Sequence, residues 1–341
     1  QNPDLKIFSV MPGDGLFAIC HCPDCQAEII KDLPHGRFSR HVWGFVNKVA
    51  KKVAKVFPDK LIGCCAYEDY LNPPDDLVLE TNVAVMICYH RYNMHNPAYA
   101  KKIHKIIDSW SAKSKNVYTW NYYLSWVTTF NGLLDGSPRQ FQADYKRLVS
   151  SGVWKGEFME SGYHGKMLDL ETRHPLIYVS ARTMWDPDTN VEEILNEYYR
   201  LFYGPAEKQM RTYYETAFGS YEQKVTSTRN DNAPAPEFIY PPATILVMEK
   251  ALEEAKKAVP ADSVYRRRID KVANAFLPAA EKLKGFIRLG NPKITADKIS
   301  SGNMISKVVP SSFVGINGET PEHRTWVSAG YDAENIYFRF Y

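Results

Sequence analysis

The chain has 341 residues, of which 45% are apolar and 24% are charged, and this balance excludes disordered, collagenous and coiled-coil proteins. The formal net charge of +3, from 42 Lys and Arg against 39 Asp and Glu, gives no indication of a nucleic-acid or membrane-surface partner. No apolar run approaches the roughly 18 residues of a membrane span, and the polar start of the sequence is not a signal peptide. We therefore expect a soluble, already processed chain with one or two domains.

Aromatic residues are unusually frequent, at 13% of the chain with 22 Tyr and 7 Trp, and many of them lie in segments that also carry carboxylates. Aromatic faces stack on the apolar side of a sugar ring, while polar groups beside them bind its hydroxyls. The excess therefore favours a carbohydrate ligand. On composition alone, a hydrophobic core rich in tyrosine is a better explanation of the excess than a carbohydrate-binding site.

Five short apolar runs alternate with helical patterns in the first half of the chain, which is typical of βα units and a parallel sheet. The first helix is expected to begin at Ser39 as N-cap, with Val42, Val46 and Val49 on its apolar face. The predicted strands cover residues 5–10, 61–67, 83–89, 117–126 and 154–159.

This rhythm fits a (β/α)8-type barrel or an open doubly wound sheet, and the absence of a G-x-G-x-x-G sequence after any predicted strand favours the barrel. A complete barrel takes eight strands in about 250 residues. Since five strands are recognisable, we predict an α/β barrel that is incomplete at its N-terminus and occupies residues 1–186. A helical domain at 187–290 follows, and then a β-rich segment at 291–341, the start of a β-sandwich.

Carboxylates follow three of the predicted strands, and barrel enzymes build their active sites from such strand ends. Two carboxylates are sufficient for glycoside cleavage, one as proton donor and one ionised. Residues three apart on a strand point to opposite faces, so Glu157 and Glu160 cannot both face the lumen. The acids available are Asp14, Glu68, Asp69, Glu157 and Glu160.

Aromatic and histidine side chains crowd the third and fourth strands, where they offer stacking surfaces for sugars. On the fourth strand Trp120 and Tyr122 share one face, and Asn121 and Tyr123 share the other. The sequence leaves open which face is inside. The expected substrate contacts are Asp14, Tyr67, His90, Trp120, Tyr122 and Glu157.

Three cysteines, Cys20, Cys22 and Cys25, fall in a stretch of six residues in the loop after the first predicted strand. We favour a Cys22–Cys25 disulfide or packed thiols over zinc ligands, because no second C-x-x-C follows, and over a redox site, because no thioredoxin-like context is present. Cys64, Cys65 and Cys88 fall inside apolar strands and are predicted to be core residues.

Taken together, an ordered set of short motifs resembles the group known as domain of unknown function 4838, over about residues 5–220. This group is similar to glycoside hydrolase family 163. The last motif of the chain, at 331–337, resembles a strand of sandwich-type carbohydrate-binding modules. The motifs that carry the family resemblance are Pro12-Gly13-Asp14-Gly15, Cys20-x-Cys22-x-x-Cys25, Ser39, Phe45-Val46-Asn47-x-Val49-Ala50, Phe57-Pro58-Asp59-Lys60, Ala66-Tyr67, Pro73-Pro74, Trp110 and Tyr178-x-x-Ala181-x-x-Met184-Trp185-Asp186-Pro187.

The resemblance implies an exported bacterial enzyme, secreted, periplasmic or on the cell surface: a retaining endo-β-N-acetylglucosaminidase for complex N-glycans, in which the 2-acetamido group of the substrate is the nucleophile. By position, Glu160 is the expected proton donor, Glu68 or Asp69 the orienting acid, and Asp14 a ligand of a sugar hydroxyl. The expected partner is an oligosaccharide or a glycoprotein glycan, with no nucleic acid, no membrane span, no cofactor and no active-site metal.

Two other functions remain open at the level of the sequence. A non-catalytic glycan-binding protein would use the same aromatics and carboxylates without turnover. An α-glucuronidase-like glycosidase would need cations at the sugar carboxylate, for which Arg91 and Arg139 are the nearby candidates.

Overall fold

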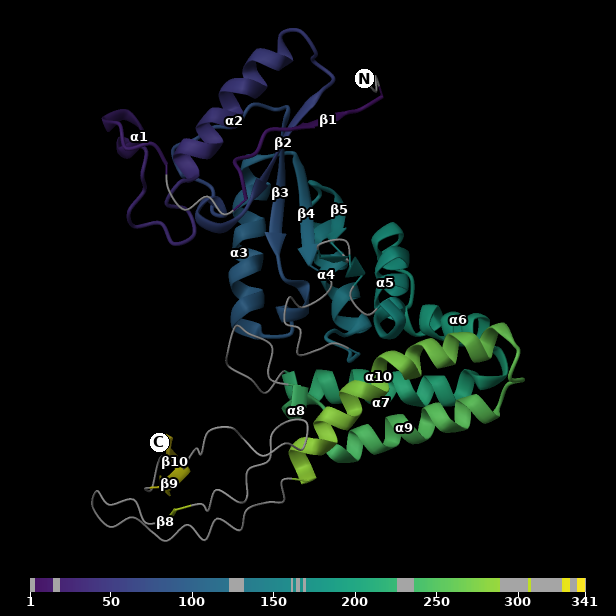
Figure 1. Ribbon diagram of the computed structural model, residues 1–341. Coiled ribbons are helices and arrows are strands. Elements are labelled where there is room, and N and C mark those ends of the chain that lie inside the picture. The colour runs from purple at the N-terminus through teal and green to yellow at the C-terminus, as the bar shows by residue number, and fades with distance from the viewer. Residues whose placement is uncertain are drawn as a thin grey trace.

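A curled parallel sheet forms the first half of the molecule (Figure 1). Its five strands are hydrogen-bonded in chain order, so each strand lies beside the next and the sheet makes a half-barrel. The strands are β1 (Ile7–Ser9), β2 (Leu61–Ala66), β3 (Val83–Tyr89), β4 (Asn116–Tyr122) and β5 (Trp154–Glu160). The computed structural model describes residues 4–14, 19–122, 132–160, 162–163, 166–167, 170–225, 236–288, 306–307, 327–331 and 336–340.

The predicted strands are confirmed, because short apolar runs bounded by turn residues are reliable signals of buried parallel strands. β3 coincides with the predicted range, and β1 is shorter at both ends. The fourth strand was predicted to reach residue 126; β4 is described to Tyr122, and residues 123–126 lie outside the described part of the chain.

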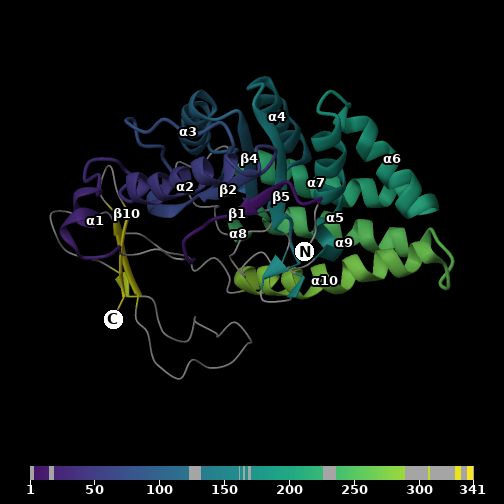
Figure 2. The ribbon, with the colours of Figure 1, turned by 90° about the horizontal axis from the view of Figure 1, so that it is seen from above.

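Three helices cover one face of the sheet (Figure 2). Their apolar stripes meet alternate strand residues, as Ile103, Ile107 and Trp110 do in the second of them. Asn96 and Ser137 cap two of the helices with their side chains, each followed by a proline at the first helical position. The helices are α2 (Ser39–Ala54), α3 (Pro97–Lys113) and α4 (Pro138–Ser150).

The predicted cap at Ser39 is wrong. Phe38 occupies the N-cap position without a side-chain hydrogen bond, and Ser39 is the first helical residue. The Ser39 hydroxyl instead donates to the backbone carbonyl of Asn72, which ties the start of α2 to the loop after β2.

The second half of the described chain is helical, as expected, and its apolar core continues into that of the sheet. The hydroxyl of Tyr221 donates to the Tyr92 carbonyl at 2.9 Å, and that of Tyr240 to the Leu134 carbonyl at 2.6 Å, so the helices hold the loops after β3 and β4. Asn190 caps α6, where its side chain accepts from the amide of Glu192. The helices are α5 (Leu170–Trp185), α6 (Val191–Tyr203), α7 (Glu207–Val225), α8 (Pro236–Ile239), α9 (Pro242–Lys257) and α10 (Val264–Arg288).

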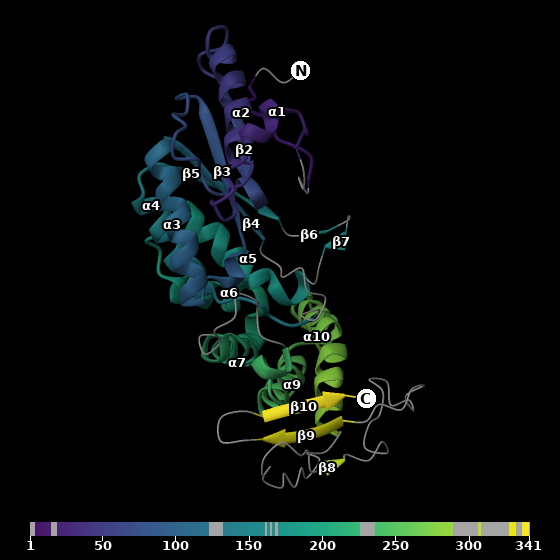
Figure 3. The same cartoon turned by 90° about the vertical axis from the view of Figure 1, so that its left-hand side faces the viewer.

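Short elements complete the fold. A three-stranded antiparallel sheet in the order β10-β9-β8 lies near the C-terminus, at the far end of the helices from the parallel sheet (Figure 3). Of the predicted 331–337 strand, Tyr331 ends β9 and Ile336 begins β10, while residues 332–335 lie outside the described residues. The remaining elements are α1 (Pro23–Ala27), β6 (Gly162–Tyr163), β7 (Lys166–Met167), β8 (Ser306–Lys307), β9 (Val327–Tyr331), β10 (Ile336–Phe340), and the 3-10 turns η1 (Glu68–Tyr70), η2 (Arg91–Asn93) and η4 (Gly204–Ala206).

Among the described residues, every helix is too short or too polar to cross a membrane.

Candidate active site

The two faces of the parallel sheet have different environments. Alternate residues of β3, such as Val85 and Ile87, enter the main core under the helices, while Cys88 belongs to a small separate cluster on the other face. We call this second face, which α2, α3 and α4 do not cover, the inner face. Its cluster comprises Cys65, Tyr67, Met86, Cys88, Trp120 and Tyr122.

A row of polar side chains crosses the inner face at the carboxyl ends of the strands. Glu160, the last residue of β5, is the register partner of Tyr122 on β4. The Trp120 indole donates to a Glu160 carboxylate oxygen at 2.8 Å. The Tyr122 ring lies 4.7 Å from the ring of His90, which follows β3. Glu160, Tyr122 and His90 therefore lie side by side, because the register of the parallel strands aligns the ends of β3, β4 and β5.

The row continues to the ends of β2 and β1 through two tyrosines. Tyr67 packs beside Tyr122, and it lies close enough to Glu68 and Asp14 for both carboxylates to raise its pKa. Burial, with the carboxylates of Glu68 and Asp14 adding to it, raises the pKa of Tyr67 to about 12, so the hydroxyl keeps its proton at neutral pH.

Glu68 reaches this row through an unusual backbone conformation. Its φ of 47° lies in the left-handed region, which a residue with a side chain adopts at a cost of about 1–3 kcal/mol. Strain of this kind clusters at functional sites. Here it occurs at the point where β2 turns into η1, and it directs Glu68 toward Tyr67 while the next residue, Asp69, points elsewhere.

His90 lies in the row as a neutral ring. Burial lowers its pKa to about 4, and its Nδ1 atom is buried with no hydrogen-bond partner among the described residues. Nδ1 could accept or donate one hydrogen bond, but the protein encloses it.

An aromatic surface borders the acids. Trp120 and Phe158 lie 4.3 Å apart between ring centroids, and Phe158 is 47% exposed. The sequence analysis did not single out Phe158, although it shares the parity of Glu160 on β5, which was the available signal. The two rings are tilted by 46° to each other and form a partly exposed apolar surface beside the Glu160 carboxylate.

A family model described as domain of unknown function (DUF4838) matches residues 1–215, which include every residue of this row. The chain belongs to the DUF4838 family. No curated protein and no solved structure matches it.

The prediction that Glu157 contacts the substrate is wrong for this DUF4838 chain, because Glu157 lies on the opposite face of the sheet. Its carboxylate is fully buried and accepts from both terminal nitrogens of Arg91, at 3.0 and 2.7 Å. It also accepts from the side chains of Thr119, Asn121 and Tyr145. The alternation along β5 explains the outcome, since Glu157 faces the helices when Glu160 faces the inner side. Glu157 is unavailable to a substrate.

Asp69 is also absent from the row. Its carboxylate forms an ion pair with Arg37 at 2.7 Å, and its backbone carbonyl accepts from the amide of Phe38. Of the two acids proposed for the orienting role, the structure brings Glu68 to the other site residues and directs Asp69 to the entry of α2.

The two arginines that an α-glucuronidase-like enzyme would need both form ion pairs with carboxylates of the protein. Arg91 is fully buried between Glu157 and Asp144, and Arg139 on α4 pairs with Glu192 of α6 and Glu215 of α7. Neither cation is placed to meet a substrate carboxylate on the inner face.

The predicted core cysteines Cys64, Cys65 and Cys88 are buried, as expected. Asn121 is buried on the helix side, where its side-chain oxygen accepts from the Arg91 amide, so Trp120 and Tyr122 are the inward pair of β4. Tyr123 lies outside the described residues.

Proposed function

We propose that this DUF4838 chain is a glycoside hydrolase, a retaining endo-β-N-acetylglucosaminidase of the family 163 type that cleaves complex N-glycans. The observation that supports it is the continuous row from Glu160 through Tyr122 and Tyr67 to Glu68, with Asp14 beside it. These residues follow or end four different strands and meet on one face. A (β/α)8-type barrel, and a β-sandwich at the C-terminus, are part of the same proposal.

In the proposed reaction, Glu160 gives its proton to the leaving glycosidic oxygen as the C1–O bond breaks. The carbonyl oxygen of the substrate's 2-acetamido group attacks C1 and forms an oxazoline-type intermediate. Glu68 accepts a hydrogen bond from the acetamide N–H and stabilises the positive charge that develops there. Water then attacks C1, and Glu160, now ionised, takes its proton, which returns both the enzyme and the anomeric configuration to their starting state.

The surrounding residues orient the sugar. Trp120 and Phe158 stack on its apolar face, and the Trp120 indole holds the Glu160 carboxylate in place by its 2.8 Å hydrogen bond. Asp14, which is exposed at the end of the row, accepts from a sugar hydroxyl.

The test is to incubate the full chain with a glycoprotein that carries complex N-glycans and to determine the masses of the products. The proposal expects a released glycan with one N-acetylglucosamine at its reducing end and a protein that retains one N-acetylglucosamine. Binding of the glycan with unchanged masses would replace the proposal with a non-catalytic glycan-binding protein.

A further inference from the structure

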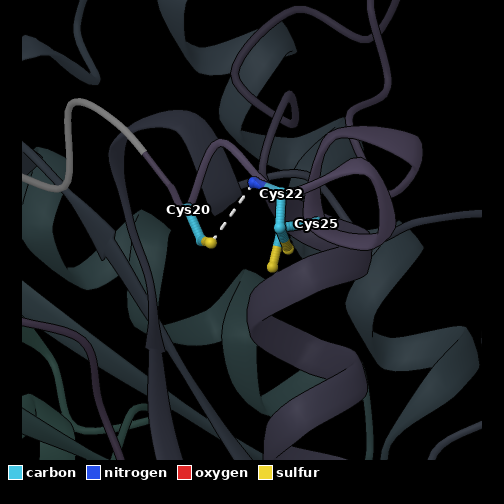
Figure 4. Close-up of side chains that lie close together, drawn as sticks. All are labelled: Cys20, Cys22 and Cys25. Atoms are coloured by element: carbon cyan, nitrogen blue, oxygen red, sulfur yellow. Dashed lines mark hydrogen bonds between the residues drawn. The ribbon is translucent and has the colours of Figure 1, made fainter.

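Three thiols converge outside the candidate active site, in the segment that follows β1. The Sγ atoms of Cys20, Cys22 and Cys25 all lie within 4.8 Å of one another (Figure 4). None is joined in a disulfide. Cys20 and Cys22 are exposed, contrary to the expectation of buried thiols, whereas Cys25 is half-buried and packs against the core. Cys22 and Cys25 flank the first turn of α1, and Cys20 approaches them from the preceding loop.

This separation suits one metal ion better than one disulfide. Tetrahedral Zn²⁺ with bonds of about 2.3 Å to sulfur holds its sulfurs about 3.8 Å apart, which small side-chain rotations reach from the observed positions. A disulfide would consume two of the three sulfurs and leave the third as an exposed free thiol. A zinc ion uses all three.

Hydrogen bonds already order the segment around the sulfurs. The Cys22 amide donates to Cys20 Sγ at 3.4 Å. The Gln26 side chain donates to the Cys20 carbonyl at 2.8 Å, which fixes the loop on the start of α1. Such outer contacts orient metal ligands and stabilise thiolates.

We propose that Cys20, Cys22 and Cys25 bind one Zn²⁺ as three thiolate ligands, with a water molecule in the fourth position. Among the described residues only these three offer ligand atoms to the cluster, and the exposure of Cys20 and Cys22 leaves its outer side open to solvent. Each thiol releases its proton to solvent on binding, so three protons leave for each ion. Bound there, the ion would join the loop that carries Cys20 to the start of α1. Metal binding is independent of the proposed glycosidase activity.

The test uses the full chain, reduced, freed of metal with a chelator, and titrated with Zn²⁺ or Co²⁺. We expect one ion per chain, and with Co²⁺ the thiolate-to-cobalt charge-transfer bands that report sulfur ligands. This spectrum of the unaltered chain tests the proposal even where a variant does not fold. A chain that takes up no metal once reduced, or binds Co²⁺ without those bands, would overturn it.

Single replacements then identify the ligands. Cys20→Ser, Cys22→Ser and Cys25→Ser should each lower the zinc affinity by at least the roughly 10- to 100-fold that loss of an outer-shell partner causes. The matched control is Asp24→Asn, an exposed side chain in the same turn that offers no ligand to the cluster, and it should leave the affinity unchanged. Unchanged affinity in all three serine variants would refute the assignment.

Discussion

Glu68 and Asp69 are neighbours in the sequence, yet the structure gives them different partners. Glu68 lies beside Tyr67 in the row on the inner face, where its carboxylate helps to raise the Tyr67 pKa, whereas Asp69 pairs with Arg37 at 2.7 Å. Sequence analysis placed both at the strand end and could not separate them, because the distinction depends on the positive φ of Glu68 and on an arginine 32 positions away.

The pair gives a matched comparison of activity. Glu68→Gln should reduce kcat by roughly 10²-fold or more, because an ionised partner of the acetamide is lost. Asp69→Asn should leave kcat within about twofold, since the ion pair that it removes is partly exposed and worth about 1 kcal/mol or less. Steady-state kinetics on one N-glycan substrate measures both. Equal losses in the two variants would contradict the assignment of Glu68.

Arg91 illustrates a second limit of the sequence. The alternation of side chains along a strand correctly predicted that Glu157 and Glu160 face opposite sides of the sheet. It does not predict on which side a buried cation lies. That cation lies 66 positions before Glu157, on the turn after β3. Long-range ion pairs leave no local signal, so Glu157 looked like a strand-end acid of the active site.

Arg91→Ala should lower the free energy of unfolding by about 3–5 kcal/mol, because it leaves Asp144 and Glu157 buried without their cation. Arg139→Ala is the control: this arginine also binds several carboxylates, but its side chain is 36% exposed and the expected loss is about 1 kcal/mol. Urea unfolding gives both values. A loss below about 1 kcal/mol for Arg91→Ala would show that the buried network contributes little.

At the scale of elements, strands and amphipathic helices were predictable and α5 was not. α5 carries Pro175 within it and buries the polar residues Thr172, Arg173, Ser180 and Thr183, so its sequence lacks a clear apolar stripe. Arg173 is held by a buried ion pair with Asp135 at 3.0 Å. Polar residues that are buried only because a distant partner satisfies them defeat periodicity-based prediction.

The contact between the loop before α4 and α10 gives a prediction for a single glycine. Gly132 has a φ of 78°, and a Cβ there would lie 2.1 Å from the backbone oxygen of Ala275 on α10. Gly132→Ala should therefore cost about 1–2 kcal/mol for the left-handed backbone and about 1–3 kcal/mol more for the clash.

Gly152 is the matched control, with a φ of 72° and open space around its Cβ position, so Gly152→Ala should show the backbone cost alone. The two variants are compared by their unfolding midpoints in urea. Equal shifts of the two midpoints would mean that α10 does not lie close enough to Gly132 to exclude a side chain there.

For the whole molecule, buried histidines make stability depend on pH. Burial lowers the pKa of His90, His95 and His174 to about 4, whereas the unfolded chain titrates near 6.5. The unfolded state therefore binds more protons between these values, and stability present above about pH 6.5 is lost as the pH falls toward 4. Asp144, whose pKa burial raises to about 7, acts in the opposite direction.

With three histidines against one carboxyl, the free energy of unfolding should fall by at most about 3 kcal/mol per pH unit between pH 6 and 5. Urea unfolding at pH 7, 6 and 5 measures the slope. Replacing His174, which contacts Tyr198 in the helical half, with Gln should reduce the slope by up to about 1.4 kcal/mol per pH unit. A stability that is flat over this range would show that these rings are accessible to water.

The proposed function of the whole molecule depends on Glu160 acting as an acid on a glycan bound at the inner face. The most direct measurement is kcat/KM of Glu160→Gln against the unaltered chain on a complex N-glycan, with unfolding midpoints compared to confirm that the variant is folded. We predict a loss of about 10²- to 10⁴-fold, the usual contribution of a general acid. A folded Glu160→Gln variant with nearly unchanged kcat/KM would contradict the proposed active site.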